Sequence, residues 1–246
     1  MVVSLAVAQS PLGQITTRDV HALLWLPDGR IVFGHHDGLQ VSLDGGGSWQ
    51  NLVAKPNWDA MNLAWDGKKL VVAGHEIFLE SSDLKTFRSL RYQGLPGLDL
   101  HGYAVNPKNS TQHYAWEARL GLFASRDGGK TWEPRPSSGL SQKGMVHALA
   151  VGPDGTVYAT GMGMGLYQSR TGGQRFEAVS MPENDLFSLA ATADGFFYAG
   201  GKIGLWQRTE AGWKRIAPGP VISLAVNPVD STRLVWIDGA GRVWRR

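Results

Sequence analysis

The sequence repeats itself with a period of about 40 residues, and this repeat constrains the fold more than any other feature. One unit reads Val20-His21-Ala22-Leu23-Leu24-Trp25, followed by a Pro-Asp-Gly turn at 27–29 and an apolar run. A later unit keeps this order, with Val146-His147-Ala148-Leu149-Ala150-Val151 and Pro-Asp-Gly at 153–155. A further run that precedes a serine or its equivalent recurs near positions 38, 77, 121, 165, 204 and 241, which divides the chain into six units.

Each unit contains four short runs rich in Val, Leu, Tyr, Trp and Phe, separated by turn sequences. Four strands at this period are typical of propeller blades. The sequence therefore predicts an all-β, six-bladed β-propeller that forms a single domain over 1–246. We name the strands of each blade a to d, and the predicted a strands are 20–25, 60–65, 100–105, 146–151, 186–191 and 221–226.

The sixth unit ends after its third strand, at Gly241-Arg242-Val243-Trp244-Arg245, so its d strand must come from elsewhere. An open ring would leave two unpaired sheet edges, which is costly. The N-terminal run Val2-Val3-Ser4-Leu5-Ala6-Val7 has a suitable length to complete the sixth blade. The alternative is that Met1–Ala8, which is apolar and ends in small residues, is the remnant of a secretory signal. We favour the strand because it closes the ring.

Composition excludes several classes of protein. The chain has no cysteine, which excludes disulfides, cysteine-ligated zinc and thiol catalysis. Its net charge of +3 is spread along the sequence and forms no basic stripe, so nucleic acid is not an expected partner. No apolar run is long enough to predict a membrane span. We expect a monomer.

The turns between strands c and d carry a recurrent motif. Ser42-Leu43-Asp44-Gly45-Gly46-Gly47-Ser48-Trp49 and Ser125-Arg126-Asp127-Gly128-Gly129-Lys130-Thr131-Trp132 resemble the Asp box, or BNR repeat, of sialidase-like propellers. Partial copies include Asp83 with Phe87, and a copy ending in Phe176 that lacks the aspartate. An aspartate at the head of a tight turn accepts backbone N–H bonds. We therefore expect a structural role for Ser42, Asp44, Trp49, Asp83, Phe87, Ser125, Asp127, Trp132 and Phe176.

The whole pattern is similar to bacterial BNR-repeat proteins that are loosely labelled glycosyl hydrolases, and more distantly to the photosystem II assembly factor family. The resemblance implies a periplasmic or extracellular location. It leaves two alternative functions open, a glycoside hydrolase and an assembly factor that binds a partner protein. The hydrolase label follows the fold, and a fold does not determine a reaction.

The histidines are distributed unevenly. In a meander, strand a begins and strand b ends on the same face of the ring, which we call the funnel face. His21, His101 and His147 begin strand a of three blades, and His35, His36 and His75 end strand b of two. Carboxylate and thioether side chains are placed nearby, at Glu117, Met162 and Met164. Neutral imidazoles with such neighbours suit zinc, copper or nickel, so the sequence predicts a metal or small-ligand site here.

Catalysis is the weaker interpretation. The inward-facing carboxylates predicted for an acid–base pair are Glu117, Asp99 and Asp59, and no spacing between them requires a glycosidase. We find no arginine triad suited to a sialidase, no nucleophile elbow, no phosphate-binding loop and no zinc-protease motif. The sequence therefore favours a non-catalytic propeller that binds a metal, a small ligand or a partner protein on its funnel face.

Overall fold

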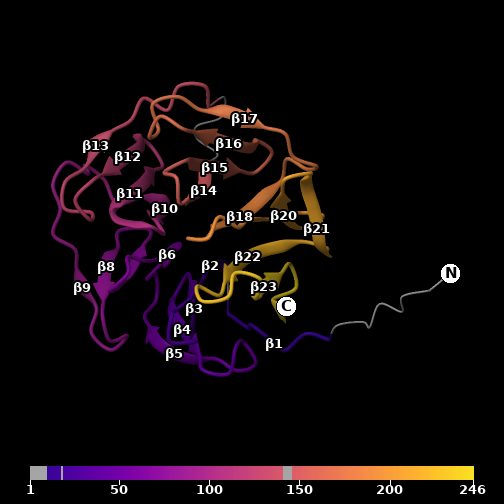
Figure 1. Ribbon diagram of the computed structural model, residues 1–246. Coiled ribbons are helices and arrows are strands. Elements are labelled where there is room, and N and C mark those ends of the chain that lie inside the picture. Colours follow the sequence, from indigo (N-terminus) through magenta and orange to yellow (C-terminus); the bar gives the residue numbers. More distant parts are fainter. Residues whose placement is uncertain (1–9, 18, 141–145) are drawn as a thin grey trace.

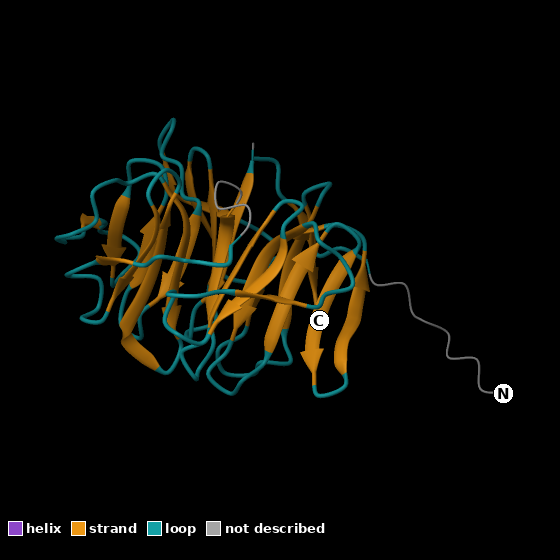
Figure 2. Cartoon of the chain, turned by 90° about the horizontal axis from the view of Figure 1, so that it is seen from above, coloured by secondary structure: helices purple, strands orange, loops and turns teal. Residues whose placement is uncertain are grey.

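The computed structural model describes residues 10–17, 19–140 and 146–246, and in these ranges it contains strands and no helix. The strands form six antiparallel four-stranded sheets arranged as a ring (Figure 1). Seen from the side, the strands cross the thickness of a disc and the loops lie on its two faces (Figure 2). The prediction of a six-bladed propeller is confirmed.

Five blades are built from consecutive strands. The first blade contains β2 (Val20–Trp25), β3 (Ile31–His35), β4 (Gly38–Ser42) and β5 (Gln50–Ala54), and the second contains β6 (Asn62–Trp65), β7 (Leu70–Ala73), β8 (Phe78–Ser81) and β9 (Arg88–Ser89). The third contains β10 (Leu100–Asn106), β11 (Asn109–Glu117), β12 (Gly121–Ser125) and β13 (Glu133–Pro134), and the fourth contains β14 (Val146–Val151), β15 (Val157–Gly161), β16 (Gly165–Ser169) and β17 (Glu177–Val179). The fifth contains β18 (Leu186–Ala191), β19 (Phe197–Gly201), β20 (Gly204–Thr209) and β21 (Gly212–Pro218). The a strands β2, β6, β10, β14 and β18 lie innermost in the ring (Figure 1).

The sixth blade joins the two ends of the described chain. It consists of β22 (Val221–Val226), β23 (Leu234–Asp238), β24 (Arg242–Arg245) and the N-terminal β1 (Gly13–Gln14). Gly13 pairs with Val243, and Ile15 N–H donates to the Gly241 carbonyl at 2.8 Å. Closure of the ring by an N-terminal strand is thus confirmed, but the strand is 13–14. The predicted closing run 2–7 lies outside the described residues.

The reason for this difference is that the observed closing strand carries little hydrophobic signal. Only two residues of β1 pair with β24, and Ile15 beyond it is the nearby side chain that enters the core, with 6 % exposure. Backbone hydrogen bonds between Leu12 and Val243, and between Ile15 and Gly241, extend the contact. Backbone pairing needs no particular side chain. The hydrophobic pattern therefore favoured the apolar run 2–7 as the closing strand.

The core lies between neighbouring blades. Trp116 and Leu122 of the third blade pack with Leu149 and Val157 of the fourth in one buried cluster. Equivalent clusters fill the other interfaces described. Burying each such large apolar side chain contributes about 1.5–3 kcal/mol. These interfaces hold the inner strands in a fixed arrangement, and so they fix the loops of the funnel face.

The c–d turns are organised by a serine and an aspartate. In the third blade, Asp127 Oδ1 accepts hydrogen bonds from the backbone N–H groups of Lys130 and Thr131, and Asp127 Oδ2 accepts one from the Thr131 hydroxyl. The Ser125 hydroxyl donates to Asp127 and accepts from the N–H of Gly129. Asp44 makes the corresponding contacts in the first blade.

We expect Asp127→Ala to lower the free energy of unfolding at pH 7 by about 1–2 kcal/mol, because it removes charge-assisted hydrogen bonds from an exposed turn. The Thr131 hydroxyl and N–H hold the pKa of Asp127 well below its ordinary value. This stabilisation is therefore complete above the unfolded pKa of about 3.9 and is lost as the pH falls towards the folded one. Urea unfolding of both proteins at pH 7 and below pH 4 tests this. A difference that does not shrink on acidification would contradict it.

Candidate metal centre on the funnel face

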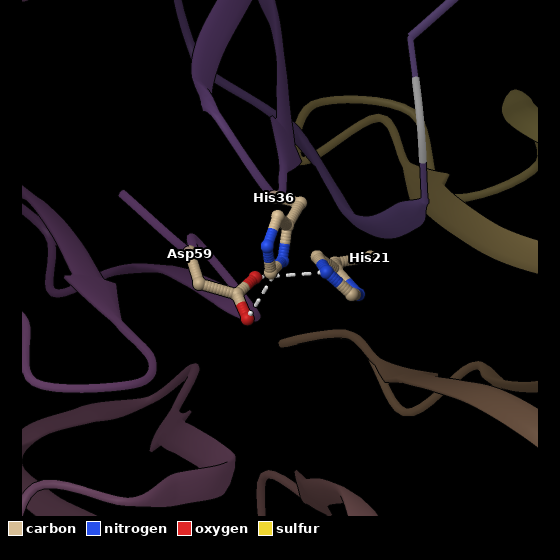
Figure 3. A group of neighbouring side chains, drawn as sticks. All are labelled: His21, His36 and Asp59. Carbon is tan, nitrogen blue, oxygen red and sulfur yellow. Dashed lines mark ion pairs between the residues drawn. The ribbon is translucent and has the colours of Figure 1, made fainter. Parts of the chain in front are cut away.

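Four histidines and two aspartates from the first three blades meet on the funnel face. His21 lies on β2 and His36 follows β3; His75 follows β7 and His101 lies on β10. The two aspartates, Asp59 and Asp99, lie just before β6 and β10. We call His21, His36 and Asp59 the inner triad (Figure 3) and His75, Asp99 and His101 the outer triad.

A β-bulge at the start of strand a orients the side chains of two of these histidines. The register between strands a and b shifts between Val20 and Ala22 in the first blade, and between Leu100 and Gly102 in the third. His21 and His101 are the extra residues at these bulges. A β-bulge bends its strand and redirects the side chain. The same shift recurs at His147, Phe187 and Ile222, so the bulge is common to five blades and does not depend on a histidine.

Backbone contacts between blades hold His75 and Asp99 side by side. These two residues form an isolated antiparallel bridge, and the N–H of Glu76 donates to the Leu98 carbonyl at 2.9 Å. The N–H of Ala118 donates to the Asp99 carbonyl at 2.9 Å. Glu76 has a φ of 57°, a left-handed conformation that costs energy for a side-chain-bearing residue. The loop that carries His75 is therefore fixed before any ligand binds.

Asp59 is the centre of the histidine group. It is only 3 % exposed. Its Oδ1 lies 2.8 Å from His21 Nε2, and its Oδ2 lies 2.9 Å from His75 Nδ1 and 3.3 Å from His36 Nδ1. Burial alone raises the pKa of Asp59, but the contact with His21 and the charges of the three histidines outweigh burial and lower it. Asp59 is therefore ionised at neutral pH.

The outer triad has nearly equal separations between its three ligand atoms. Asp99 Oδ1 lies 3.1 Å from His75 Nε2 and 3.1 Å from His101 Nε2, and the two nitrogens are 3.2 Å apart. An ion about 2.1 Å from each atom would see them about 100° apart, between tetrahedral and octahedral angles. The side chains of His75, Asp99 and His101 are 44 %, 33 % and 30 % exposed. A site here would keep an open coordination position.

Several polar atoms at the centre of this group lack hydrogen bonds. His21 Nε2, Asp59 Oδ1 and Asp99 Oδ1 are buried and have no hydrogen-bond partner among the described residues beyond their ion pairs. Their nearest partners are the ion-pair contacts of the two triads, at 2.8–3.1 Å. Buried polar atoms without partners are costly. Metal ligands gather in this way, because an ion between them would balance the buried charge and the lone pairs together.

The other histidines of the predicted site, His35 and His147, are not members of either triad. His35 is buried, stacks on Phe33 and accepts the Asp37 N–H through Nδ1. Burial lowers the pKa of His35, so its ring is neutral at pH 7. His147 occupies the bulge of the fourth blade, half-buried, and neither triad includes it.

The remaining predicted residues have other surroundings. Glu117 is buried, and its Oε2 accepts the N–H groups of Arg119 and Leu120, which closes the b–c turn of the third blade. Met164 packs in the apolar cluster between the third and fourth blades, because its turn folds back onto that interface. Met162 is exposed. Thus neither Glu117 nor Met164 faces the histidines as the sequence had suggested.

The sequence placed Asp59 and Asp99 among candidates for acid–base chemistry and missed that they hold the histidines together. Both lie in the connection that leads into strand a, Asp99 two residues before His101. Each contacts a histidine from the preceding blade, His36 or His75. The available signal was this position, since the segment leading into one blade runs beside the b–c turn of the previous one.

The comparisons with known proteins show the fold. No family model matches the sequence, and no curated protein matches it. A gluconolactonase from Xanthomonas campestris is similar in structure, with a TM-score of 0.70, 15 % identity, and coverage of 96 % of this chain and 87 % of that one. YCF48 bound to a D1 peptide has a TM-score of 0.58 and 16 % identity, over 95 % and 79 % of the two chains.

Longer enzymes contain a comparable unit. The GH74 enzyme of Niastella koreensis gives a TM-score of 0.63 and 18 % identity over 96 % of this chain. The chain spans 46 % of that enzyme and 38 % of an ancestral GH74 enzyme. Within the described residues, no helix is long and apolar enough to cross a membrane. At these identities the likeness establishes a β-propeller and leaves the function to the site itself.

Proposed function

We propose that this protein is a metal-binding propeller that holds a zinc-class divalent ion in the outer triad. The observation that carries the proposal is the separation of the three ligand atoms, 3.1, 3.1 and 3.2 Å. Two imidazoles and one carboxylate form a donor set that suits zinc, and copper or nickel as competitors. These separations match those between the ligands of an ion held about 2.1 Å from each atom.

The surroundings of His75 support the same proposal. Its Nδ1 lies 2.9 Å from Asp59 Oδ2, while its Nε2 belongs to the outer triad. A proton on Nδ1 donated to the carboxylate leaves the lone pair of Nε2 free for an ion. Histidine ligands of metals commonly have such a carboxylate behind them, which fixes the tautomer and makes the ring a better ligand.

The exposure of the outer triad supports a role in binding. An ion held by three side chains keeps a position for water, a small ligand or a donor atom of a partner protein. The alternative of a glycoside hydrolase has less support, because its three candidate carboxylates are engaged elsewhere. Asp59 and Asp99 contact histidines, and Glu117 closes a turn. A partner protein remains compatible with the exposed ion.

We also infer that the c–d turns are Asp boxes, which supports the resemblance to BNR-repeat propellers. The support comes from the shared contacts of Asp44 and Asp127, each of which accepts two backbone N–H groups and one hydroxyl on the far side of its turn.

Zinc binding by His101→Ala tests the proposed site. We expect this variant to bind zinc at least 100-fold more weakly at the outer triad, because two ligands remain of three. His147→Ala is the matched control, since it removes a histidine from the same bulge in another blade. Isothermal titration of the metal-free proteins at pH 7.5 measures both. Equal affinity in His101→Ala and the native protein would refute the proposal.

A further inference from the structure

We propose that the inner triad of His21, His36 and Asp59 holds a second divalent ion, so that the funnel face carries a pair of metal sites. This inference extends the proposed function and is carried by different residues. The ion belongs to the same borderline class as zinc, because the donors are again two imidazoles and one carboxylate.

The first argument is convergence. One ligand atom from each of the three side chains lies within 4.8 Å of the others. Asp59 Oδ1 is 2.8 Å from His21 Nε2, and Asp59 Oδ2 is 3.3 Å from His36 Nδ1. Figure 3 shows both imidazoles beside the carboxyl group of Asp59, with an ion pair from each. They come from the two strands at the open end of the β2–β3 hairpin, and the carboxylate comes from the connection into the next blade.

The second argument is that the closest pair of ligand atoms is buried and has no partner beyond the pair itself. His21 Nε2 and Asp59 Oδ1 are both buried and form an ion pair at 2.8 Å, and neither atom has a further hydrogen-bond partner among the described residues. Burying a carboxylate is costly unless positive charge and hydrogen bonds compensate for the lost water. A cation beside both atoms satisfies the oxygen and the nitrogen together. The bulge at His21 keeps the ring in this position.

The two sites differ in access. The side chains of the inner triad are 21 %, 27 % and 5 % exposed for His21, His36 and Asp59, less than those of the outer triad. His75 connects them, since its Nδ1 contacts Asp59 while its Nε2 belongs to the outer triad. We therefore expect a chelator to remove the outer ion first and the inner ion more slowly.

Counting bound zinc in variants of each triad tests the pair. The metal-free protein is dialysed against a buffered excess of free zinc, and zinc per chain is measured by elemental analysis. We expect two ions in the native protein and in His147→Ala, one in His36→Ala, one in His101→Ala and none in the double variant His36→Ala/His101→Ala. Circular dichroism and thermal unfolding of the metal-free proteins show that each variant folds, and His36→Gln replaces His36→Ala if the latter does not.

The outcomes separate this inference from the proposed function. A single ion that survives His36→Ala and is lost in His101→Ala overturns the second site and leaves the first. A single ion that is lost in both variants shows one shared site and also overturns the pair. Native protein that binds no zinc contradicts both proposals.

Discussion

Asp59→Asn is expected to empty the inner triad and to weaken zinc binding at the outer triad by about 10–100-fold. The amide keeps the shape of the side chain and removes the charge. The inner triad loses a ligand, and His75 loses the carboxylate that fixes its tautomer, although all three outer ligands remain. A loss at a site whose own ligands are intact distinguishes a supporting residue from a ligand.

Asp238→Asn is the matched control for this variant. Asp238 is also a buried carboxylate on this face, but it ends the b strand of the sixth blade and accepts the N–H groups of Ala240 and Arg242 in the b–c turn. Zinc titrations of the three metal-free proteins at one pH measure the effect. We expect Asp238→Asn to bind zinc like the native protein. If Asp59→Asn did so too, Asp59 would have no part in either site.

Gly74→Ala is expected to destabilise the fold by about 2–3 kcal/mol and to weaken zinc binding by more than tenfold. Gly74 lies between β7 and His75, where the connection into β6 passes against it. An added Cβ would overlap the carbonyl oxygen of Asp59 and lie 3.0 Å from the Met61 nitrogen. These are backbone atoms, so the Asp59 segment and the His75 segment must move apart, and a shift of about 1 Å is enough to spoil a metal site.

The control for Gly74→Ala is Gly239→Ala, in the corresponding turn of the sixth blade. Its Cβ would meet only the ring of Pro220, at 3.0 Å. We expect a loss below about 1 kcal/mol and native zinc affinity. Urea unfolding and zinc titration measure both variants. Unchanged stability and affinity in Gly74→Ala would mean that this close approach does not position the site.

The fold was predictable from sequence because each blade repeats the same order of short apolar strands and turns. Strand a must be apolar and short, and the predicted runs 20–25, 146–151, 186–191 and 221–226 coincide with β2, β14, β18 and β22. A turn follows each run after a similar number of residues, so a misplaced strand boundary in one blade does not displace the strands predicted for the next. The position of the closing strand was not predicted, because Gly13–Gln14 contributes backbone hydrogen bonds and hardly any apolar side chain.

The candidate site was predictable only in part. A meander determines the face on which a residue lies, so His21, His75 and His101 could be placed together by counting strands. The distance between residues of different blades depends on the packing of those blades. The sequence repeats do not encode this distance. For that reason the sequence did not predict that the histidines gather around Asp59, and it placed His147 in the same site.

Carboxylates were harder to interpret than histidines. Glu117 and Asp238 end strand b in two blades, and each accepts two backbone N–H groups of the turn that follows. Asp99 lies at the beginning of a blade and contacts imidazoles instead. All three are aspartate or glutamate beside a turn on one face, so residue type and periodicity alone do not separate a turn-closing role from a ligand role.

Anomalous diffraction at the zinc edge, from crystals grown with zinc, tests the central claim most directly. The account predicts a strong peak about 2.1 Å from His75 Nε2, His101 Nε2 and Asp99 Oδ1, and its absence from crystals of His101→Ala grown in the same way. Native crystals in saturating zinc with no peak within bonding distance of these three atoms would contradict it.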